Sequence, residues 1–438
     1  MKPTTKIKWI AAGAVLLAGL TALAGTPGED SWVPFDHPSI DYYNAPLDDP
    51  IARLDKQIQS GKVKLEFSEK GVGYLQSLLK ALNVSVDSQV LVFSKTSFQS
   101  PKIGPRDPRA LFFNDDVAVG SVQTSDVLEL AALDPRQGVV FYTLDNHKKE
   151  KPEFDRRDVC LQCHQGINTI GIPGILVSSV FPNGDGMPAF RGAAKGTDGR
   201  SRLEDRWGGW YVTGTHGDQR HMGNAVAHDP AAPTDLESFG TQNLTSLDKK
   251  VNLNRPTYLT KTSDIVALMT LEHQTRMTNL LIRVGWEARI AAEAGKNPLE
   301  DEGVKTDLDD MVTYMLFADE ALLHDPVKGV STYTETFQKR GPRDSKGRSL
   351  RDFDLETRLF KYPVSYMVYS EAFDRLPDVV REQVYRRVYD VLSGKDQSPK
   401  FAGLSAEKRQ AALEILRETK KNIPAYFREG PVVANAGN

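Results

Sequence analysis

The spacing of apolar residues divides the chain into parts of different character, and the first part is rich in predicted strands. Between residues 63 and 145, short runs of β-branched and aromatic residues alternate with clusters of turn-forming residues. One short helix is predicted at 73–82, ahead of these runs. The short connections between the runs favour antiparallel pairing. The predicted strands cover residues 89–93, 110–113, 117–122, 127–132 and 139–144.

Residues 256–423 show helical spacing instead. From Ile265 to Val284, apolar side chains recur three and four positions apart, which is the pattern of one face of a helix. Gly295 and Pro298 then end this helix. The predicted helices of this part cover residues 263–295, 307–323, 355–373, 378–392 and 406–421.

Residues 150–255 differ from both flanking parts. Glycine and proline are dense here, and neither helical nor strand periodicity persists. Such a long irregular stretch inside a compact protein is usually functional or disordered. The embedded aromatic residues Phe181, Phe190, Trp207 and Trp210 favour an ordered segment. A bound cofactor is the natural candidate for organising it.

The N-terminus has the pattern of a secretory signal peptide at residues 1–24. Three lysines precede an apolar stretch over residues 9–20, and Ala22-Leu23-Ala24 provides a small-x-small cleavage signal. The alternative is an uncleaved N-terminal anchor. In either case we expect an exported, periplasmic protein. No other stretch approaches the roughly 18 unbroken apolar residues of a membrane helix, so no membrane span is expected after signal cleavage.

Composition narrows the class of protein further. The chain has 438 residues, of which 55 are basic, 58 are acidic and only 2 are cysteines. Loss of the three lysines of the leader changes the formal net charge from −3 to −6. A mildly acidic surface argues against nucleic acid as a partner. Two cysteines are too few for a disulfide scaffold.

Both cysteines lie in one C-x-x-C-H pentapeptide. In an exported chain this spacing predicts covalent attachment of one haem c, with Cys160 and Cys163 as thioether anchors and His164 as the proximal iron ligand. Two alternatives stay open. A thiol–disulfide redox pair would need a thioredoxin-like strand and helix around the motif. A zinc site would need further ligands, for which His216 and His221 are available.

A second axial ligand for the iron must come from elsewhere in the chain or be absent. One glycine-flanked loop holds three candidates, His216, His221 and Met222, of which His221 is the first choice. The alternative is a surface turn with solvated histidines. Met187, flanked by glycine and proline, is a rival ligand. His273 lies on the apolar stripe of its helix, where a histidine is more often a hydrogen-bonded core residue than a ligand or an acid–base group.

Several stretches of the chain together resemble a known family. They are C-L-Q-C-H at 160–164, R-W-G-G-W-Y-V-T-G-T-H-G at 206–217 and R-H-M-G-N at 220–224, with further similarity at 112–117, 140–144, 351–354 and 361–363. They resemble exported bacterial monohaem c-type cytochrome-like proteins, a family without an established reaction. The resemblance covers most of the mature chain. It implies haem binding at Cys160, Cys163 and His164, and electron transfer.

These observations predict an α+β protein with a β-rich antiparallel N-terminal half, an irregular haem-binding middle and a helical C-terminal half. An N-terminal arm with one short helix at 49–60 precedes the sheet. The predicted segments are the arm at 25–60, a β-rich domain at 61–149, a cytochrome c-like haem-binding segment at 150–255 and a helical domain at 256–430.

The predicted function is that of a periplasmic monohaem c-type cytochrome that exchanges electrons with an unidentified periplasmic redox partner. The chain is several times larger than one haem fold needs, which departs from the small cytochromes c and keeps two alternatives open. One is a haem-dependent oxidoreductase, peroxidase-like or oxygen-using, whose iron has an open sixth coordination position. The other is a haem-based sensor or interaction protein.

Overall fold

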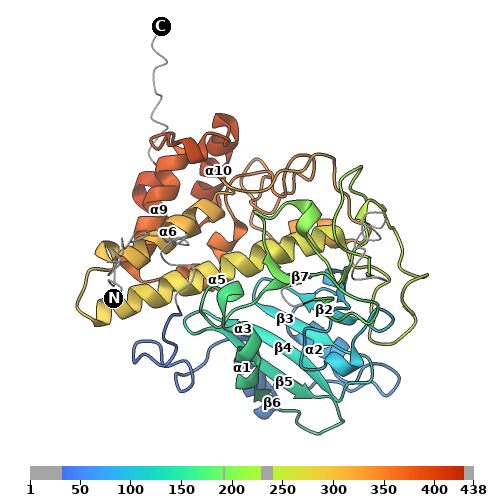
Figure 1. The fold of residues 1–438 in the computed structure, drawn as a ribbon. Coiled ribbons are helices and arrows are strands. Elements are labelled where there is room, and N and C mark those ends of the chain that lie inside the picture. Colours follow the sequence, from blue (N-terminus) through green and yellow to red (C-terminus); the bar gives the residue numbers. More distant parts are fainter. Residues whose placement is uncertain (1–31, 191–192, 228–239, 429–438) are drawn as a thin grey trace, which may run out of the picture.

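The computed structural model describes residues 32–190, 193–227 and 240–428. Within these ranges the protein has an α+β fold, with an antiparallel sheet built mainly by the N-terminal half and long helices in the C-terminal half (Figure 1). The predicted fold class is therefore confirmed. The predicted signal peptide at residues 1–24 and the start of the predicted arm lie outside the described residues.

The main sheet has seven strands in the order β6-β5-β4-β3-β2-β1-β9, and every neighbouring pair is antiparallel. All five predicted strands are confirmed. β-branched and aromatic residues dominate β5, whereas β4 consists mainly of leucine and alanine. The hairpin between β4 and β5 closes at Gly138, whose φ of +87° favours glycine. The strands are β1 (Val90–Val92), β2 (Arg109–Phe113), β3 (Val117–Ser121), β4 (Val127–Asp134), β5 (Gly138–Asp145), β6 (Phe154–Arg156) and β9 (Trp210–Tyr211).

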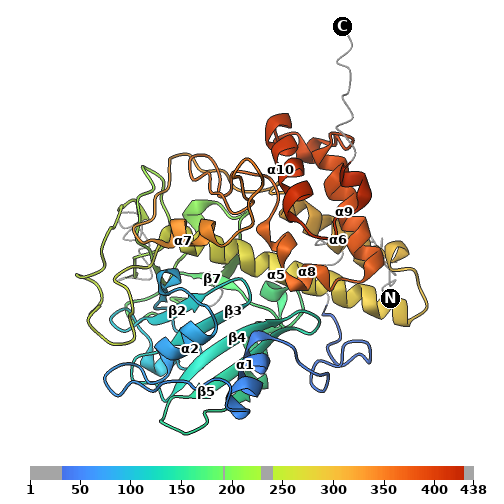
Figure 2. The ribbon, with the colours of Figure 1, turned by 180° about the vertical axis from the view of Figure 1, so that it is seen from behind.

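Two helices from the N-terminal part cover one face of the sheet (Figure 2). They are α1 (Pro50–Gln59) and α2 (Leu75–Ala81), close to the two helices predicted there. The Asp49 carboxylate caps α1 by accepting hydrogen bonds from the backbone N–H groups of Ile51 and Ala52. Its other oxygen accepts a hydrogen bond from the Tyr142 hydroxyl of β5 at 2.6 Å, which ties the start of α1 to the sheet.

The long helix α5 (Ile265–Glu293) crosses the opposite face of the sheet (Figure 1). It is buried on almost every side, because the sheet lies against one side and the later helices pack on the other. Predicted helices at 263–295, 378–392 and 406–421 are confirmed, whereas the helix predicted at 307–323 starts and ends earlier. The later helices are α6 (Glu302–Met315), α7 (Tyr333–Lys339), α8 (Glu371–Asp374), α9 (Asp378–Leu392) and α10 (Ala406–Thr419).

The helix predicted at 355–373 is wrong. Most of this stretch is irregular chain, and only the 3₁₀ turn at Tyr366–Tyr369 and the start of α8 are helical. Pro363 cannot donate a backbone hydrogen bond inside a helix. The Asp354 carboxylate accepts a hydrogen bond from the backbone N–H of Thr357 at 2.8 Å, which stabilises a local turn in place of a helix. The apolar residues here fill the core from a loop, and their spacing therefore carried no helical information.

The middle of the chain contributes only short elements. Those that the structure describes between residues 150 and 255 are at most four residues long: besides β6 and β9 they include α3 (Leu161–His164), β7 (Val177–Val180) and β8 (Ala194–Thr197). β6 and β9 form the two edges of the main sheet, and β7 pairs with β8. The middle is therefore built into the sheet at both edges. In the described ranges, no helix is both long and apolar enough to span a bilayer.

Candidate functional site

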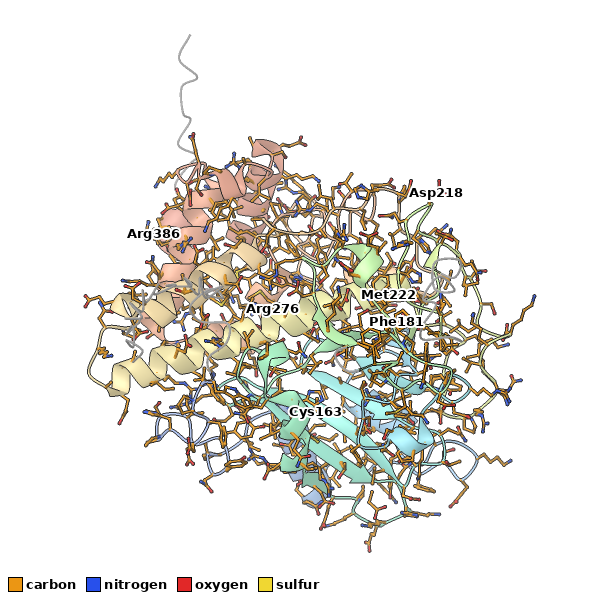
Figure 3. All side chains as sticks on the ribbon, viewed as in Figure 1. Cys163, Phe181, Asp218, Met222, Arg276 and Arg386 are labelled. Atoms are coloured by element: carbon orange, nitrogen blue, oxygen red, sulfur yellow. The ribbon has the colours of Figure 1, made fainter. Side chains whose placement is uncertain are left out.

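The C-x-x-C-H motif occupies two consecutive short turns of helix, beginning with the 3₁₀ turn at Asp158–Cys160 and continuing into α3. Residues three and four apart share one helical face, so this winding groups Cys160 with Cys163 and His164. Cys163 is exposed and Cys160 is half-buried, and the two form no disulfide. Figure 3 shows Cys163 on a segment lying in front of the sheet. Both sulfur atoms are therefore free for covalent modification.

The His164 ring is held in one orientation. Its Nδ1 atom lies 3.0 Å from the carbonyl oxygen of Gly174, and its ring centroid lies 4.7 Å from that of Phe141 in β5. A carbonyl only accepts hydrogen bonds, so Nδ1 carries the proton and the lone pair of the neutral ring is on Nε2. Burial lowers the pKa of His164 to about 4. The result is a neutral imidazole, oriented by a backbone carbonyl, with a nitrogen available to a metal.

Below the motif lies the α5-facing side of the sheet, which is incompletely covered there. Leu111 of β2, Ala118 of β3 and Ala131 of β4 all point to this side, yet each stays partly exposed. Gly120 of β3 faces the same side but is buried, because the side chains of Leu111 and Glu129 close over it. The partly exposed apolar side chains of this face are therefore those of Leu111, Ala118 and Ala131.

A charged pair lies next to this surface. Arg109 of β2 donates to Glu129 of β4 at 2.7 Å, and Ser97 and Gln99 donate to the other carboxylate oxygen. Glu129 acts electrostatically on the Cys160 thiol, whose pKa is raised to about 11, mainly by burial. The Arg109 Nε group is buried and has no hydrogen-bond partner among the described residues. This orphaned donor suits an additional anionic group.

Three large exposed apolar side chains lie in segments next to the motif or to Glu129. We call them the apolar rim, and they are 47–71 % exposed: Phe98, Val159 and Ile167. Val159 and Ile167 flank the C-x-x-C-H motif, and Phe98 lies between the two residues that bind Glu129. Met187, the rival ligand, is 46 % exposed as well, but its turn contacts Phe93 beyond the end of β1.

In the loop predicted to supply the sixth ligand, both histidines are buried and contact each other. His216 and His221 are 1 % and 3 % exposed, and their ring centroids lie 4.8 Å apart. His216 Nδ1 lies 2.7 Å from the Gln219 carbonyl oxygen, while His221 Nδ1 accepts from the backbone N–H of Gly223 at 2.9 Å. Nε2 of His221 is buried and has no hydrogen-bond partner among the described residues. The structure thus pairs these two histidines with each other.

The same loop does not contact the C-x-x-C-H motif. Met222 places its sulfur 3.6 Å from the Ser179 hydroxyl of β7, and His221 packs on the ring of Trp207. Cys163 and Met222 are well separated in the view of Figure 3. Ligation of a haem at Cys163 by His216, His221 or Met222 would therefore require this buried loop to rearrange.

His273 is a core residue, as its place on the apolar stripe of the helix suggested. It is 1 % exposed, and its Nε2 atom lies 2.8 Å from the Ser365 hydroxyl. Its ring stacks on Tyr314 at 5.3 Å and lies 4.6 Å from Phe317. A histidine enclosed in this way stabilises the interior and does not serve as an axial ligand.

The enclosure of His273 predicts a pH-dependent stability. Burial lowers its pKa from 6.5 to about 3. At acid pH this histidine is therefore protonated in the unfolded chain but not in the folded protein. Stability is therefore lost as the pH falls below about 6.5, by about 2 kcal/mol at pH 5. Urea unfolding at pH 7.5 and pH 5 should show that His273→Gln reduces the pH dependence by this amount. The substitution His147→Gln at an exposed site is the control, and equal pH dependence in His273→Gln and the unaltered protein would refute the prediction.

The side chains around the cysteines oppose the two alternatives to haem. A redox-active dithiol needs a thiol pKa below its usual value, whereas burial raises that of Cys160. A structural zinc ion needs four protein ligands, and the described residues contain no group of three or more His, Cys, Asp or Glu side chains placed to hold a metal.

Sequence reasoning missed Arg109 and Glu129. Glu129 alternates with the buried Leu128 and Leu130, a pattern that is typical of a strand with one face in solvent. Nothing in the pattern shows that this face lies under the C-x-x-C-H motif. The interaction of Glu129 with Ser97 and Gln99 is equally non-local, because 30 or more residues separate the partners.

Comparison of the chain with protein-family models, with curated proteins and with solved structures finds no match. The family resemblance of the sequence motifs therefore stays a prediction.

Proposed function

We propose that the protein is an exported, periplasmic monohaem c-type cytochrome whose function is electron transfer with a redox partner. Cys160 and Cys163 would anchor the haem, and His164 would bind its iron through Nε2. The observation that carries the proposal is the combination of two cysteine thiols that form no disulfide with an oriented, neutral imidazole in two helical turns. Two thioether bonds and one axial bond to a single macrocycle require this grouping.

The surroundings of the motif fit a haem. When bound, the haem supplies an iron that can accept and release one electron. Each thiol would add across one vinyl group, with sulfur bonding to one carbon and hydrogen to the other, so no oxidant would be needed. The partly exposed apolar residues of the sheet surface and the apolar rim would pack against the flat apolar macrocycle. The orphaned Nε–H of Arg109 suits a propionate carboxylate.

One cavity supports a second candidate, a haem oxidoreductase with an open sixth position. A cavity of about 270 Å³ lies between the chain that follows His164, the β7–β8 hairpin and α5. Apolar side chains from the first element face charged and polar ones from the others, a mixture found in small-molecule sites. Lining residues include Ile170, Leu176, Thr197, Arg200, Arg276 and Asn279. A small polar substrate next to the haem is the use that this cavity suggests.

Optical spectra of the protein, produced with the c-type maturation machinery, separate the two candidates. For a carrier we expect a six-coordinate, low-spin haem in both oxidation states and a single reversible one-electron step. A saturated iron changes its ligand geometry little on electron transfer, which suits that role. A five-coordinate, high-spin spectrum would favour the oxidoreductase, and absence of any haem signal would contradict both.

A further inference from the structure

Large apolar side chains are exposed on two segments next to the C-x-x-C-H motif. Val159 and Ile167 flank the motif itself, whereas Trp32 and Tyr43 belong to the N-terminal arm. These four side chains, which we call the arm–motif patch, are 42–71 % exposed. Large exposed apolar side chains that lie together mark a surface that binds a ligand or a partner.

The start of the arm lies beside the turn that follows the motif. The Val33 N–H donates to the Gly171 carbonyl at 3.2 Å, and the Gly171 N–H donates to the Gly166 carbonyl at 2.9 Å. The second of these hydrogen bonds closes the turn that carries Ile167. Trp32, which precedes Val33 in the chain, is therefore placed next to this turn.

The far part of the arm lies beside the residues that lead into the motif. The Arg156 guanidinium of β6 donates to the Tyr43 carbonyl at 3.1 Å, and its Cζ lies 5.8 Å from the centre of the Tyr43 ring. Its Nε lies 3.5 Å from the carboxylate of Asp158, the residue before Val159. Figure 1 shows the arm, in blue, next to α3. The patch therefore borders the motif from both of its flanks.

Carboxylates outnumber basic groups in the two segments that carry the patch. Residues 32–44 and 154–168 contain four carboxylates, two guanidiniums and no lysine. One of the guanidiniums, that of Arg156, is paired with Asp158. An acidic border around an apolar centre complements a basic partner and speeds the encounter with it. The exposed charged residues of these segments are Asp36, Asp155, Asp158 and Arg157.

We propose that the arm–motif patch is the surface on which a basic redox protein docks. The inference rests on the proposed haem attachment at Cys160 and Cys163. Because Cys163 is exposed, a macrocycle bonded to it begins at the protein surface, between Val159 and Ile167 in the chain. One electron then passes between the two redox centres, one being oxidised as the other is reduced, with no atom transferred. Electron-transfer complexes have small interfaces, which a patch of four side chains matches.

Binding to a basic c-type cytochrome tests the proposal, with titration calorimetry for affinity and stopped-flow absorbance for electron transfer. The double variant Trp32→Ser, Ile167→Ser removes exposed side chains and is expected to weaken binding about tenfold or more, since aromatic anchors dominate interface energies. The double variant Asp36→Lys, Asp155→Lys is expected to slow association at low salt and to flatten its dependence on salt. Val86→Ser, the matched control, alters a side chain that is 44 % exposed on the turn before β1, five strands from β6, and is expected to change neither quantity.

Reduction by dithionite separates loss of docking from damage to the haem, because a small reductant needs no docking surface. Its rate is expected to be the same in all variants. The inference is overturned if the unaltered protein does not bind the basic cytochrome, or if the Trp32→Ser, Ile167→Ser variant binds it as tightly as the unaltered protein does. Binding to phosphatidylcholine vesicles that is lost in this variant would assign the patch to a lipid bilayer and would also overturn it.

The mass of each denatured protein reports separately whether haem is attached. A protein that carries covalent haem but shows no effect of the patch variants refutes the docking surface only. A protein without covalent haem refutes the proposed function itself.

Discussion

Replacing both Cys160 and Cys163 with alanine is expected to abolish haem attachment completely and to make residues 150–255 sensitive to protease. The apolar rim and the partly exposed sheet surface would then have no ligand to cover them. The described elements of this middle part are at most four residues long, so opening them locally costs little free energy once the haem surface is absent. Limited proteolysis followed by mass spectrometry would locate the new cleavage sites.

The single variants Cys160→Ala and Cys163→Ala are the controls, because each leaves one thioether bond possible. Cys163 is exposed, so its truncation removes little packing and separates loss of attachment from loss of core contacts. If the double variant resists protease as well as the haem-loaded protein does, protein contacts alone hold the middle of the chain, and the organising role assigned to haem is wrong.

Replacing Arg283 with methionine is expected to lower the free energy of unfolding by about 3–5 kcal/mol, because it removes one partner from a buried charge cluster. The Arg283 side chain is 1 % exposed and forms ion pairs with Asp307 of α6 and with Glu287. Burial and the neighbouring Asp307 raise the pKa of the Glu287 carboxyl. It also donates to the Ile170 carbonyl.

The contact with Ile170 connects the helical core to the segment that follows the C-x-x-C-H motif. Ile170 has a φ of +51°, an unfavourable conformation for a β-branched residue, and it lies six residues after His164. Loss of Arg283 should therefore also loosen the chain behind the motif. Urea denaturation measures the change in stability, with Arg53→Met as a surface control expected to cost less than about 1 kcal/mol. A loss below 1 kcal/mol for Arg283→Met would contradict the role given to this cluster.

Local patterns in the sequence were sufficient to predict most strands of the sheet and the helices that have clear start and stop residues. The five strands of the N-terminal half have compact apolar runs between turn formers, and α9 matches its predicted bounds because Pro377 and Gly394 enclose it. The prediction of a helix at 355–373 was wrong. Its apolar residues pack in the core from irregular chain, so hydrophobic spacing there reports burial and not a helix.

The motif at Cys160, Cys163 and His164 was evident from the sequence because its chemistry depends on local spacing. The residues around the motif could not be predicted, since their positions depend on the register of strands that are distant in the sequence. Arg109 and Glu129 meet from β2 and β4, and the Gly174 carbonyl reaches His164 across an irregular turn. The sequence predicted that the loop with His216 and His221 supplies the sixth ligand, because several possible ligands lie close together there. The structure instead buries these two side chains against each other.

The mass of the intact, denatured protein shows whether haem is covalently attached to the chain. The protein would be produced in bacteria with the c-type maturation machinery, purified from the periplasm and measured after unfolding. We predict the mass of a polypeptide beginning at residue 25 plus one haem, with no loss of haem on acid–acetone extraction. A mass equal to the polypeptide alone, with any haem passing into the acetone, would contradict covalent attachment at Cys160 and Cys163.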